Sequence, residues 1–523
     1  MLELRPDIRS QLDENAKPVV VDWTGPTRAS LDPFVVEMLR CLDRAESLDH
    51  AWARMEEAGL AAEVDRESFD EFFESAVSPY FLSEELLAWQ AHQREQGRAA
   101  RMDGLAAAIE YASTKVPYYR QLRGATDWRI REAGDLQRLP LLTRAELRTH
   151  FPTALLAEGP NYAALIASDV ASVGYTTSPM NRAPYFLSEA DAEVELPITV
   201  FKNGERGAIF KPPCPTSTAK CMVTSPSLEE RTQGVRLFLR MFSDPMYVPD
   251  AEVRTAHEEV LAHGPQCFWG NPWYMMTVMA RFEALGLPLP DSVEGILFEG
   301  EYVPAPIRGY VRRQFGLRPF DIYETCGVPL VAMSCPLGRY HVANHCHLEF
   351  LRDGREVAEG EVGEVVLTTL SQRAMPLLRY RTGDLARKGG ACPCGHPAPT
   401  FEALHRLTDC LALGERVVPM EEIDRELGGI EDLLYYRLFQ HPDEAVSAEC
   451  GVVPSRLGQE QNVVTAVRDV VRARGFAVDR VSIRRISPRP SKKFGPLVSK
   501  VARLPQRVAQ AYELEKHAAH IAL

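Results

Sequence analysis

The stretch from Met375 to Asp384 constrains the fold of this chain more than any other part, and it reads M-P-L-L-R-Y-R-T-G-D. An apolar pair leads into residues 379–381, which predicts a strand, and Thr382-Gly383 then predicts a turn that exposes the carboxylate of Asp384. A carboxylate presented at the end of a strand can hold a polyol or lie beside phosphate groups. A plain surface hairpin is the alternative interpretation of the same residues.

Length and charge exclude several classes of protein. At 523 residues the chain exceeds what a single hydrophobic core supports, so we expect two or three domains. With 45% apolar and 25% charged residues, the composition is that of a folded chain and not of a largely disordered one. The formal net charge of -13 gives no general attraction to a phosphate backbone, so we expect no nucleic-acid partner.

The cysteines and the apolar runs indicate the cellular setting. Eleven cysteines are scattered without the framework of a small disulfide-rich domain, and the first residues, M-L-E-L-R-P-D, lack the apolar core of a signal peptide. No run approaches the roughly twenty apolar residues that span a bilayer. We therefore expect a reducing, cytoplasmic setting and no membrane partner.

The first 92 residues are expected to form a mostly helical accessory domain. Pro33 lies near the start of one predicted helix, and a second helix over Asp70 to Val77 stops before Pro79. The pattern faintly resembles small winged-helix peptide-binding domains; a plain helical domain packed on the main body is the alternative. Further along, Thr143 predicts a helix N-cap, with Glu146 completing a capping box.

Residues 185–300 alternate helix and strand signals, which favours a layered α/β body. We predict helices beginning at Ser188 and over residues 233–242, 251–263 and 273–286, with strands between them. The segment Cys267 to Pro272 lies at a strand-to-helix junction, where such sheets build ligand pockets. Trp269 and Asn271 are therefore predicted to line the pocket of an organic acid.

Two pairs of soft ligands predict a metal site. Cys335 and His341 are separated by five residues, and Cys392 and Cys394 by one. Thiolate and imidazole suit tetrahedral zinc, and four protein ligands with no open position would make the ion structural. Buried free thiols are the alternative. The residues that compete for the fourth position are His345, Cys346, His347 and His396.

The letters R-Y-R-T-G-D closely resemble the ribose-binding signature of the adenylate-forming enzymes. The flanking L-T-T-L and C-P-C-G-H resemble the phenylacetate-coenzyme A ligase branch, and the resemblance covers about residues 95–505. It implies an α/β fold in which a large body with layered sheets, residues 93–408, is followed by a small α+β lid domain, residues 409–523. It also implies ATP, Mg²⁺ and possible use of coenzyme A, with Asp384 on the ribose.

The phosphate loop departs from the family pattern. The family writes S-S-G-T-T-G, and here Thr176 and Thr177 remain while Tyr175 and Ser178 replace glycines. Phosphate loops need small residues, because backbone N–H groups and hydroxyls must approach the phosphate oxygens closely. The resemblance assigns Thr176 and Thr177 to phosphate; a Ser/Thr-rich turn is the alternative.

Two further motifs of the family border the nucleotide. Gly300-Glu301 ends an apolar strand and matches a G-E that lies against adenine, and Tyr323 in D-I-Y-E-T-C-G would stack on the purine. The acid that binds magnesium in this motif is replaced by Gly327. Glu324, three residues earlier, is therefore the expected magnesium ligand.

The sequence H-R-L-T-D at residues 405–409 resembles the family's hinge, which precedes its lid domain. By resemblance, Arg406 lies near ribose and phosphate, Asp409 is the pivot, and Lys500 reaches the substrate carboxylate and the α-phosphate. A cation there would stabilise the charge that develops as pyrophosphate leaves. Lys492 and Lys493 could replace Lys500, and a solvated basic tail is the alternative.

The resemblance implies an AMP-forming ligase that acts on a small-molecule carboxylic acid, with an aryl acid favoured. A carboxylate oxygen attacks the α-phosphate of ATP, pyrophosphate leaves, and coenzyme A captures the mixed anhydride. Two alternatives stay open. The acyl group passes to an amine or a carrier protein that docks on the N-terminal domain, or the chain is a non-catalytic nucleotide-binding module. A homodimer is compatible with each of these.

Overall fold

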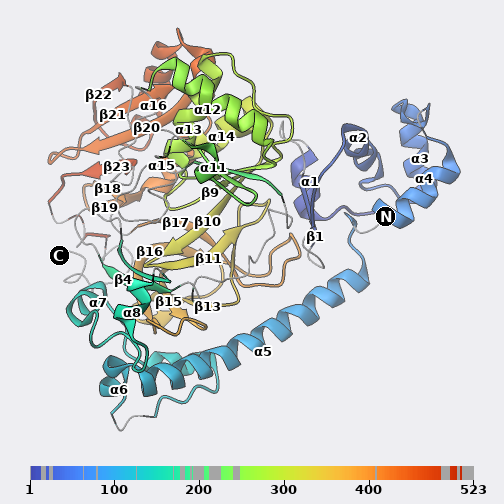
Figure 1. The fold of residues 1–523 in the computed structure, drawn as a ribbon. Helices are drawn as coiled ribbons and strands as arrows, with labels where there is room; N and C mark the ends of the chain where they lie inside the picture. The colour runs from blue at the N-terminus through green and yellow to red at the C-terminus, as the bar shows by residue number, and fades with distance from the viewer. Residues whose placement is uncertain are drawn as a thin grey trace.

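The computed structural model has three parts: an N-terminal lobe, a large body around one long sheet, and a C-terminal unit with its own small sheet (Figure 1). Within the described residues, no helix is long and apolar enough to cross a membrane. The structure describes residues 2–12, 19–22, 27–62, 64–77, 80–124, 127–168, 170–176, 183–188, 191, 205–210, 225, 227–239, 248–406, 409–484, 495–502, 504 and 507–508.

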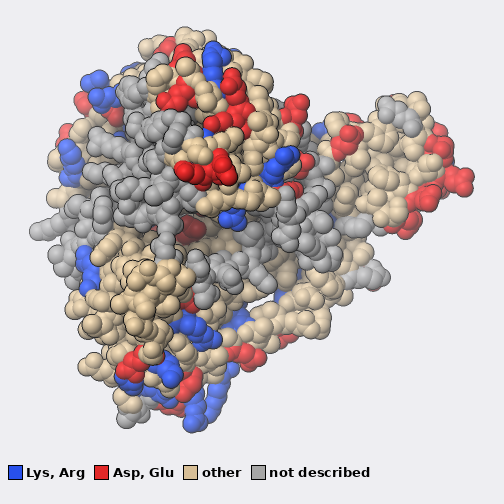
Figure 2. Space-filling view, in the orientation of Figure 1, with Lys and Arg blue, Asp and Glu red and all other residues tan. Residues whose placement is uncertain are grey.

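The N-terminal lobe has a hydrophobic core of its own, built from side chains between Leu4 and Phe81. The side chain of Asp32 caps α2, which begins at a proline as predicted, and the predicted helix near residues 70–77 is α4 followed by a π-helical turn, η2. Acidic side chains gather on the outer edge of the lobe, around α3 and α4, at the right of the view (Figure 2). Its elements are α1 (Pro6–Leu12), β1 (Val19–Asp22), β2 (Thr27–Ser30), α2 (Pro33–Leu42), α3 (Leu48–Glu57), η1 (Leu60–Ala62), α4 (Arg66–Phe72) and η2 (Phe73–Val77).

A long helix, α5 (Glu84–Lys115), leads from this lobe along the body and runs without a break through residue 92 (Figure 1). The buried Arg101 fastens it, because its Nη1 donates a hydrogen bond to the carbonyl oxygen of Ala343 at 3.0 Å. The predicted capping box of Thr143 and Glu146 is confirmed at the start of α7. The elements that follow α5 are α6 (Pro117–Arg123), η4 (Ala133–Arg138), α7 (Arg144–His150) and α8 (Tyr162–Ala167).

The body is organised by a thirteen-stranded mixed sheet with the order β14-β13-β15-β16-β17-β12-β11-β10-β9-β8-β5-β7-β6. The sheet changes from parallel to antiparallel pairing at strand β10, because β10 pairs parallel with β9 and antiparallel with β11. Strands β3 (Ala171–Tyr175) and β4 (Pro184–Ser188) form a separate antiparallel pair. The strands of the large sheet are β5 (Gly207–Phe210), β6 (Thr232–Gln233), β7 (Arg236–Phe238), β8 (Cys267–Gly270), β9 (Gly295–Phe298), β10 (Pro319–Thr325), β11 (Val328–Ser334), β12 (Tyr340–Val342), β13 (Cys346–Arg352), β14 (Arg355–Glu356), β15 (Val362–Thr369), β16 (Tyr380–Lys388) and β17 (Thr400–Arg406).

Helices pack on the parallel part of this sheet and share one apolar core with it. The predicted helices near residues 251–263 and 273–286 are confirmed as α12 (Asp250–His263) and α13 (Pro272–Ala284), and α14 (Ala305–Phe315) packs in the same core. The short helix α11 (Leu228–Arg231) directly precedes β6. The helix predicted over residues 233–242 is wrong, because residues 236–238 form strand β7 beside β5. The short run pairs with a neighbouring strand, which its apolar spacing alone does not reveal. The helix expected from Ser188 lies largely outside the described residues.

The C-terminal unit combines a four-stranded sheet, ordered β22-β21-β20-β23, with two helices. Valines on one face of α16 pack on this sheet together with Ile423 and Leu427 of α15. A two-stranded ribbon, β18 and β19, precedes α15. The elements are β18 (Cys410–Leu413), β19 (Arg416–Pro419), α15 (Met420–Leu427), β20 (Leu433–Gln440), β21 (Val446–Val452), η5 (Pro454–Arg456), α16 (Glu460–Ala473), β22 (Val478–Ile483) and β23 (Leu497–Ser499).

Candidate functional site

Three of the predicted site residues meet on the large sheet. The hydroxyl of Tyr323, on β10, donates a hydrogen bond to Asp384 Oδ2 at 2.7 Å, and Arg406 Nε lies 3.4 Å from Asp384 Oδ1. Asp384 and Arg406 are direct cross-strand partners on β16 and β17. Burial, and then the neighbouring carboxylate of Asp384, raise the pKa of Tyr323 well above its usual value, so the hydroxyl stays protonated and donates. The carboxylate is thereby held in one orientation while part of it remains exposed.

The turn predicted at Thr382-Gly383 is instead a bulge inside β16. Residues 382–384 stand opposite the single residue Val365, because Arg381 pairs with Val366 and Leu385 with Glu364. Gly383 has a φ of +79°, a conformation that favours glycine, and Asp384 N–H donates to Thr382 Oγ1 at 3.1 Å. A bulge re-aims a side chain without ending the strand, and here it presents Asp384.

The two arginines of R-Y-R-T-G-D are buried in ion pairs with glutamates of other strands. Arg379 Nη2 lies 2.8 Å from Glu349 Oε1 on β13, and Arg381 Nη2 lies 2.6 Å from Glu364 Oε2 on β15. Each guanidinium also donates through Nε to the same carboxylate. Such two-point pairs fix geometry, so these arginines hold β16 in place behind Asp384.

Thr176 closes the base of the loop between β3 and β4. Its N–H donates to the carbonyl oxygen of Ala183, and its Oγ1 accepts from the N–H of Ala183, both at 2.9 Å. The rest of the predicted phosphate loop, with Thr177 and Ser178, lies outside the described residues. Thr176 therefore fixes where the loop leaves the sheet.

The β3–β4 pair reaches the nucleotide motif through Tyr185. The ring of Tyr185 covers Gly174 on β3 and Gly327 beside β10; a Cβ atom on Gly327 would lie 2.2 Å from Tyr185 Cδ2. Cys326 and Gly327 form the two-residue turn between β10 and β11, both with positive φ. A side chain at position 327 would require the Tyr185 ring to move, and the positive φ there also favours glycine. Glu324 lies exposed on β10, before this turn.

The residues predicted to border adenine and the acid follow neighbouring parallel strands. Gly300, with φ +80°, and Glu301 follow β9. Trp269, at the end of β8, donates from Nε1 to Glu299 Oε2 at 2.7 Å, and the Arg236 guanidinium lies 5.6 Å from the centre of its ring. Because β8 and β9 are parallel, these residues share one edge of the sheet.

Asn271 has a structural contact that the sequence analysis did not assign. Its Oδ1 accepts a hydrogen bond from Tyr274 N–H at 3.0 Å and caps the N-terminus of α13. The proline that follows it is the first residue of the helix, a position that suits proline because its missing N–H would be unsatisfied there anyway. An asparagine followed by a proline, as at residues 271–272, is typical of a helix N-cap, so the sequence could have predicted this contact.

The four predicted soft ligands come together in a buried cluster, with all four ligand atoms within 4.8 Å of one another. Cys335 Sγ lies 3.8 Å from Cys392 Sγ, and Cys394 Sγ lies 3.4 Å from His341 Nε2. Bond lengths of about 2.3 Å for Zn–S and about 2.0 Å for Zn–N at the tetrahedral angle predict separations of about 3.8 Å and about 3.5 Å. The donor set and its spacing therefore fit a tetrahedral zinc ion with no open position.

The hinge and lid residues lie in two different parts of the fold. Asp409 N–H donates to the carbonyl oxygen of Arg406 at 2.9 Å, which places the hinge directly after β17. Lys500 is exposed after β23, where its N–H donates to Gln440 O at 2.9 Å. Lys500 thus belongs to the C-terminal sheet, whereas Tyr323, Asp384 and Arg406 belong to the large sheet. Lys492 and Lys493 lie outside the described residues.

Several residues near the site were missed by the sequence analysis. Arg144 of α7 donates from Nη2 to Thr382 O at 3.2 Å and so ties the bulge to the first helices of the body. Tyr302 directly follows Gly300-Glu301 and donates to Asp424 of α15. Asp424 carried a readable signal, because it lies on the buried stripe of its helix with Met420, Ile423 and Leu427, where a charge needs partners.

Comparisons with known proteins agree with the sequence motifs, although no protein-family model matches the chain. The chain is 27% identical over 324 residues to a phenylacetate-coenzyme A ligase of Thermus thermophilus, covering 58% of this chain and 68% of the relative. It is 24% identical over 309 residues to a phenylacetate-coenzyme A ligase of Aromatoleum evansii, covering 56% and 67%. A solved structure of 2-hydroxyisobutyryl-CoA ligase in its postadenylation state matches with a TM-score of 0.59 and 16% identity, over 79% of this chain and 92% of that chain. The large mixed sheet with packed helices therefore has the α/β fold that the sequence predicts.

Proposed function

Because the chain belongs to the adenylate-forming superfamily, on its phenylacetate-coenzyme A ligase-like branch, we propose that it activates a small carboxylic acid with ATP and transfers the acyl group to coenzyme A. A carboxylate oxygen attacks the α-phosphorus, the bond to the bridging oxygen breaks, and pyrophosphate leaves. The thiolate sulfur of coenzyme A then attacks the acyl carbon of the mixed anhydride, and AMP leaves.

The observation that carries this proposal is the oriented carboxylate of Asp384. Tyr323 and Arg406 hold it from two other strands, and a bulge presents it at the surface of the sheet. A fixed acceptor of this kind suits the vicinal hydroxyls of a ribose, because both can donate to one carboxylate. We assign Asp384 to the ribose, with Arg406 beside the ribose and phosphate.

The remaining assignments follow from the positions of the residues around this carboxylate. Gly300-Glu301 would border the adenine and Tyr323 would contact it, while Glu324 would bind the magnesium ion. We place the phosphates at the loop that contains Thr177 and whose base is closed by Thr176. Positioning and charge neutralisation are the chief contributions of such a site.

The C-terminal unit would supply the cation for the first reaction. Lys500 is exposed at the end of β23, and its neighbour Val501 packs in one apolar cluster with Leu385, the residue after Asp384. The unit would pivot at Asp409, next to Arg406. We therefore propose Lys500 as the group that neutralises the charge on the phosphoryl oxygens, and expect Lys500→Ala to abolish adenylate formation while ATP still binds.

The pocket for the acid would lie beside Trp269 and Asn271, at the carboxyl end of β8. Trp269 is only partly buried and its indole N–H is engaged by Glu299, so the ring is held in one place. A fixed aromatic face at the pocket favours an aryl acid, because offset or edge contacts between rings add to the burial of apolar surface.

We also propose a structural zinc ion bound by Cys335, His341, Cys392 and Cys394. The four side chains are buried and come from the β11–β12 hairpin and from the loop between β16 and β17. The ion would therefore cross-link that loop to the hairpin. It would have no part in the transfer reaction, since every coordination position would be filled by protein.

The test of the proposed function is ATP–pyrophosphate exchange with a panel of aryl, aliphatic and amino acids, with magnesium present and coenzyme A absent. Exchange with one acid establishes adenylation and identifies the acid. Addition of coenzyme A, of amines or of a carrier protein then identifies the acceptor by the product formed. Absence of exchange with every acid, while ATP still binds, would overturn the proposal.

A further inference from the structure

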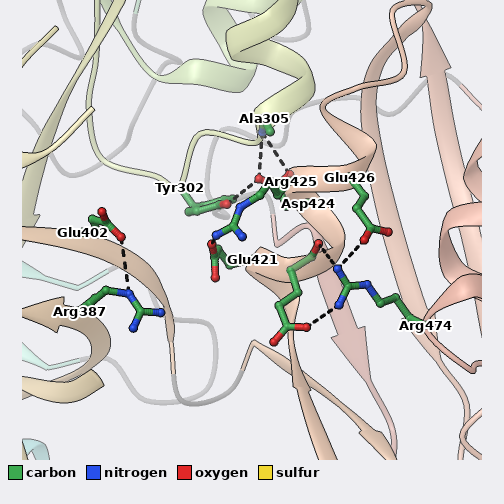
Figure 3. A network of polar contacts seen from close by, with 10 residues as sticks. Tyr302, Ala305, Arg387, Glu402, Glu421, Asp424, Arg425, Glu426 and Arg474 are labelled. Carbon is green, nitrogen blue, oxygen red and sulfur yellow. Dashed lines mark hydrogen bonds and ion pairs between the residues drawn. The ribbon is translucent and has the colours of Figure 1, made fainter. Parts of the chain in front are cut away.

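A buried carboxylate of the C-terminal unit contacts the body directly after the predicted adenine segment. Asp424 of α15 is only 4% exposed. Its Oδ2 accepts from the Tyr302 hydroxyl at 2.6 Å, and its two oxygens lie 3.1 and 3.0 Å from the N–H nitrogen of Ala305 (Figure 3). A fourth contact comes from within the unit, because the Tyr436 hydroxyl donates to Oδ1 at 2.6 Å.

This carboxylate caps a helix that does not belong to its own part of the fold. Helix α14 begins at Ala305, and the residue before it, Pro304, offers no side-chain cap. The first N–H groups of a helix need acceptors from elsewhere, and a negative charge there also interacts favourably with the helix dipole. Asp424 accepts the N–H of Ala305, the first of these groups, and places a carboxylate at the positive end of the dipole, so the C-terminal unit contributes to the N-terminus of α14.

The other acidic residues of α15 point to different partners. Glu421 pairs with Arg425 on the same helix, and Glu422 and Glu426 both pair with Arg474, which follows α16 (Figure 3). These three pairs lie within the C-terminal unit and are partly exposed. Asp424 thus differs from its neighbours both in burial and in reaching across to the body.

The contact bears on the nucleotide because of its place in the chain. Tyr302 directly follows Gly300-Glu301, and its side chain packs against the apolar core of the C-terminal unit. Ala305 lies three residues further on. Asp424 therefore holds residues 302–305 at two points, and just before them stands Gly300, whose positive φ is a conformation that other residues rarely adopt.

We propose that Asp424 is a positioning residue for the nucleotide: by holding Tyr302 and Ala305 it keeps Gly300-Glu301 in the conformation that receives adenine. This role rests on the proposed function and adds to it a dependence of ATP binding on the C-terminal unit. If the segment were released, only a fraction of molecules would be competent, and apparent affinity would fall by that fraction.

Two tyrosines provide a matched test, since both donate to this carboxylate over the same distance of 2.6 Å. Tyr302→Phe removes the bond from the body, and Tyr436→Phe removes the bond from within the C-terminal unit. The assay is ATP–pyrophosphate exchange with the full chain at varied ATP, together with thermal unfolding of each variant. A hydrogen bond to a charged group predicts a rise of about tenfold in KM for ATP in Tyr302→Phe.

We expect kcat to change by no more than about twofold in Tyr302→Phe, since the bond does not involve the reacting atoms. Tyr436→Phe should lower thermal stability and leave KM for ATP unchanged. If the wild type is active and the two variants have the same KM for ATP, the positioning role is overturned and the proposed function stands. A wild type that shows no exchange with any acid overturns the proposed function and this role together.

Discussion

Replacing Cys392 by serine tests the proposed zinc site most directly. Cys392 is 4% exposed and lies 3.8 Å, sulfur to sulfur, from Cys335, in the loop between β16 and β17. Serine removes a thiolate ligand at nearly constant size, so the four-ligand set is broken with little change in packing. Cys346 is the matched control, because it is also fully buried but lies outside the cluster.

The expected effect has two parts. Burying a hydroxyl in place of a thiol costs about 1–3 kcal/mol, and both variants carry that cost. Loss of an ion present at 100 times its dissociation constant removes about a further 2.7 kcal/mol from the free energy of unfolding, and only Cys392→Ser carries that loss. The difference between the two variants, about 3 kcal/mol, is therefore the contribution of the metal.

The assay combines metal analysis of the purified chain with denaturant unfolding of the wild type and both variants. We expect one zinc ion per chain in the wild type and in Cys346→Ser, and none in Cys392→Ser. A strong chelator should lower the free energy of unfolding of the wild type by about 2.7 kcal/mol, the metal contribution alone, and leave that of Cys392→Ser unchanged. Equal destabilisation by the two serines, with no zinc in the wild type, would refute the reasoning.

Three further predictions address the carboxylate site and its support. Asp384→Ala should weaken ATP binding about 10- to 100-fold, as the loss of hydrogen bonds to a charged group implies, with little change in unfolding; unchanged affinity in calorimetry would remove Asp384 from the ribose site. Glu364→Ala should cost about 3–5 kcal/mol in denaturant unfolding, because it leaves the buried guanidinium of Arg381 without its partner; a loss below about 1 kcal/mol would contradict a buried pair. Burial lowers the pKa of His405 from 6.5 to about 4, so the folded chain keeps it neutral while the unfolded chain protonates it. Stability should therefore be full above pH 6.5 and fall between pH 6.5 and 4 by up to about 1.4 kcal/mol per pH unit, and His405→Asn should flatten that slope in unfolding measured across this range.

Local patterns in the sequence predicted several contacts correctly. The capping box of Thr143 and Glu146 depends on residues three positions apart, and the helix that begins at Pro33 was predicted from that proline and the apolar spacing after it. The four soft ligands were also found by composition, because cysteine and histidine at short spacings have few other uses. Such features are readable because the interacting groups are close in sequence, or because few residue types can form them.

The short strand β7 and the bulge in β16 were not predictable in this way. Residues 233–242 were predicted to be a helix, and it is pairing with β5 on one side and β6 on the other that makes residues 236–238 a strand. The bulge exists because β15 imposes its register on β16 from both sides of Val365. In both cases a neighbouring strand, distant in sequence, outweighs local preference.

The sequence by itself indicated the resemblance to the adenylate-forming enzymes, the α/β class and the carboxylate of Asp384 within R-Y-R-T-G-D. Tertiary structure alone decided what surrounds it: the glutamates that neutralise Arg379 and Arg381, the ring of Tyr185 that covers Gly327, and the carboxylate of Asp424 that caps α14. The physical reason is that a motif records which groups the chemistry needs, whereas burial sets which distant groups must satisfy one another's charges and hydrogen bonds.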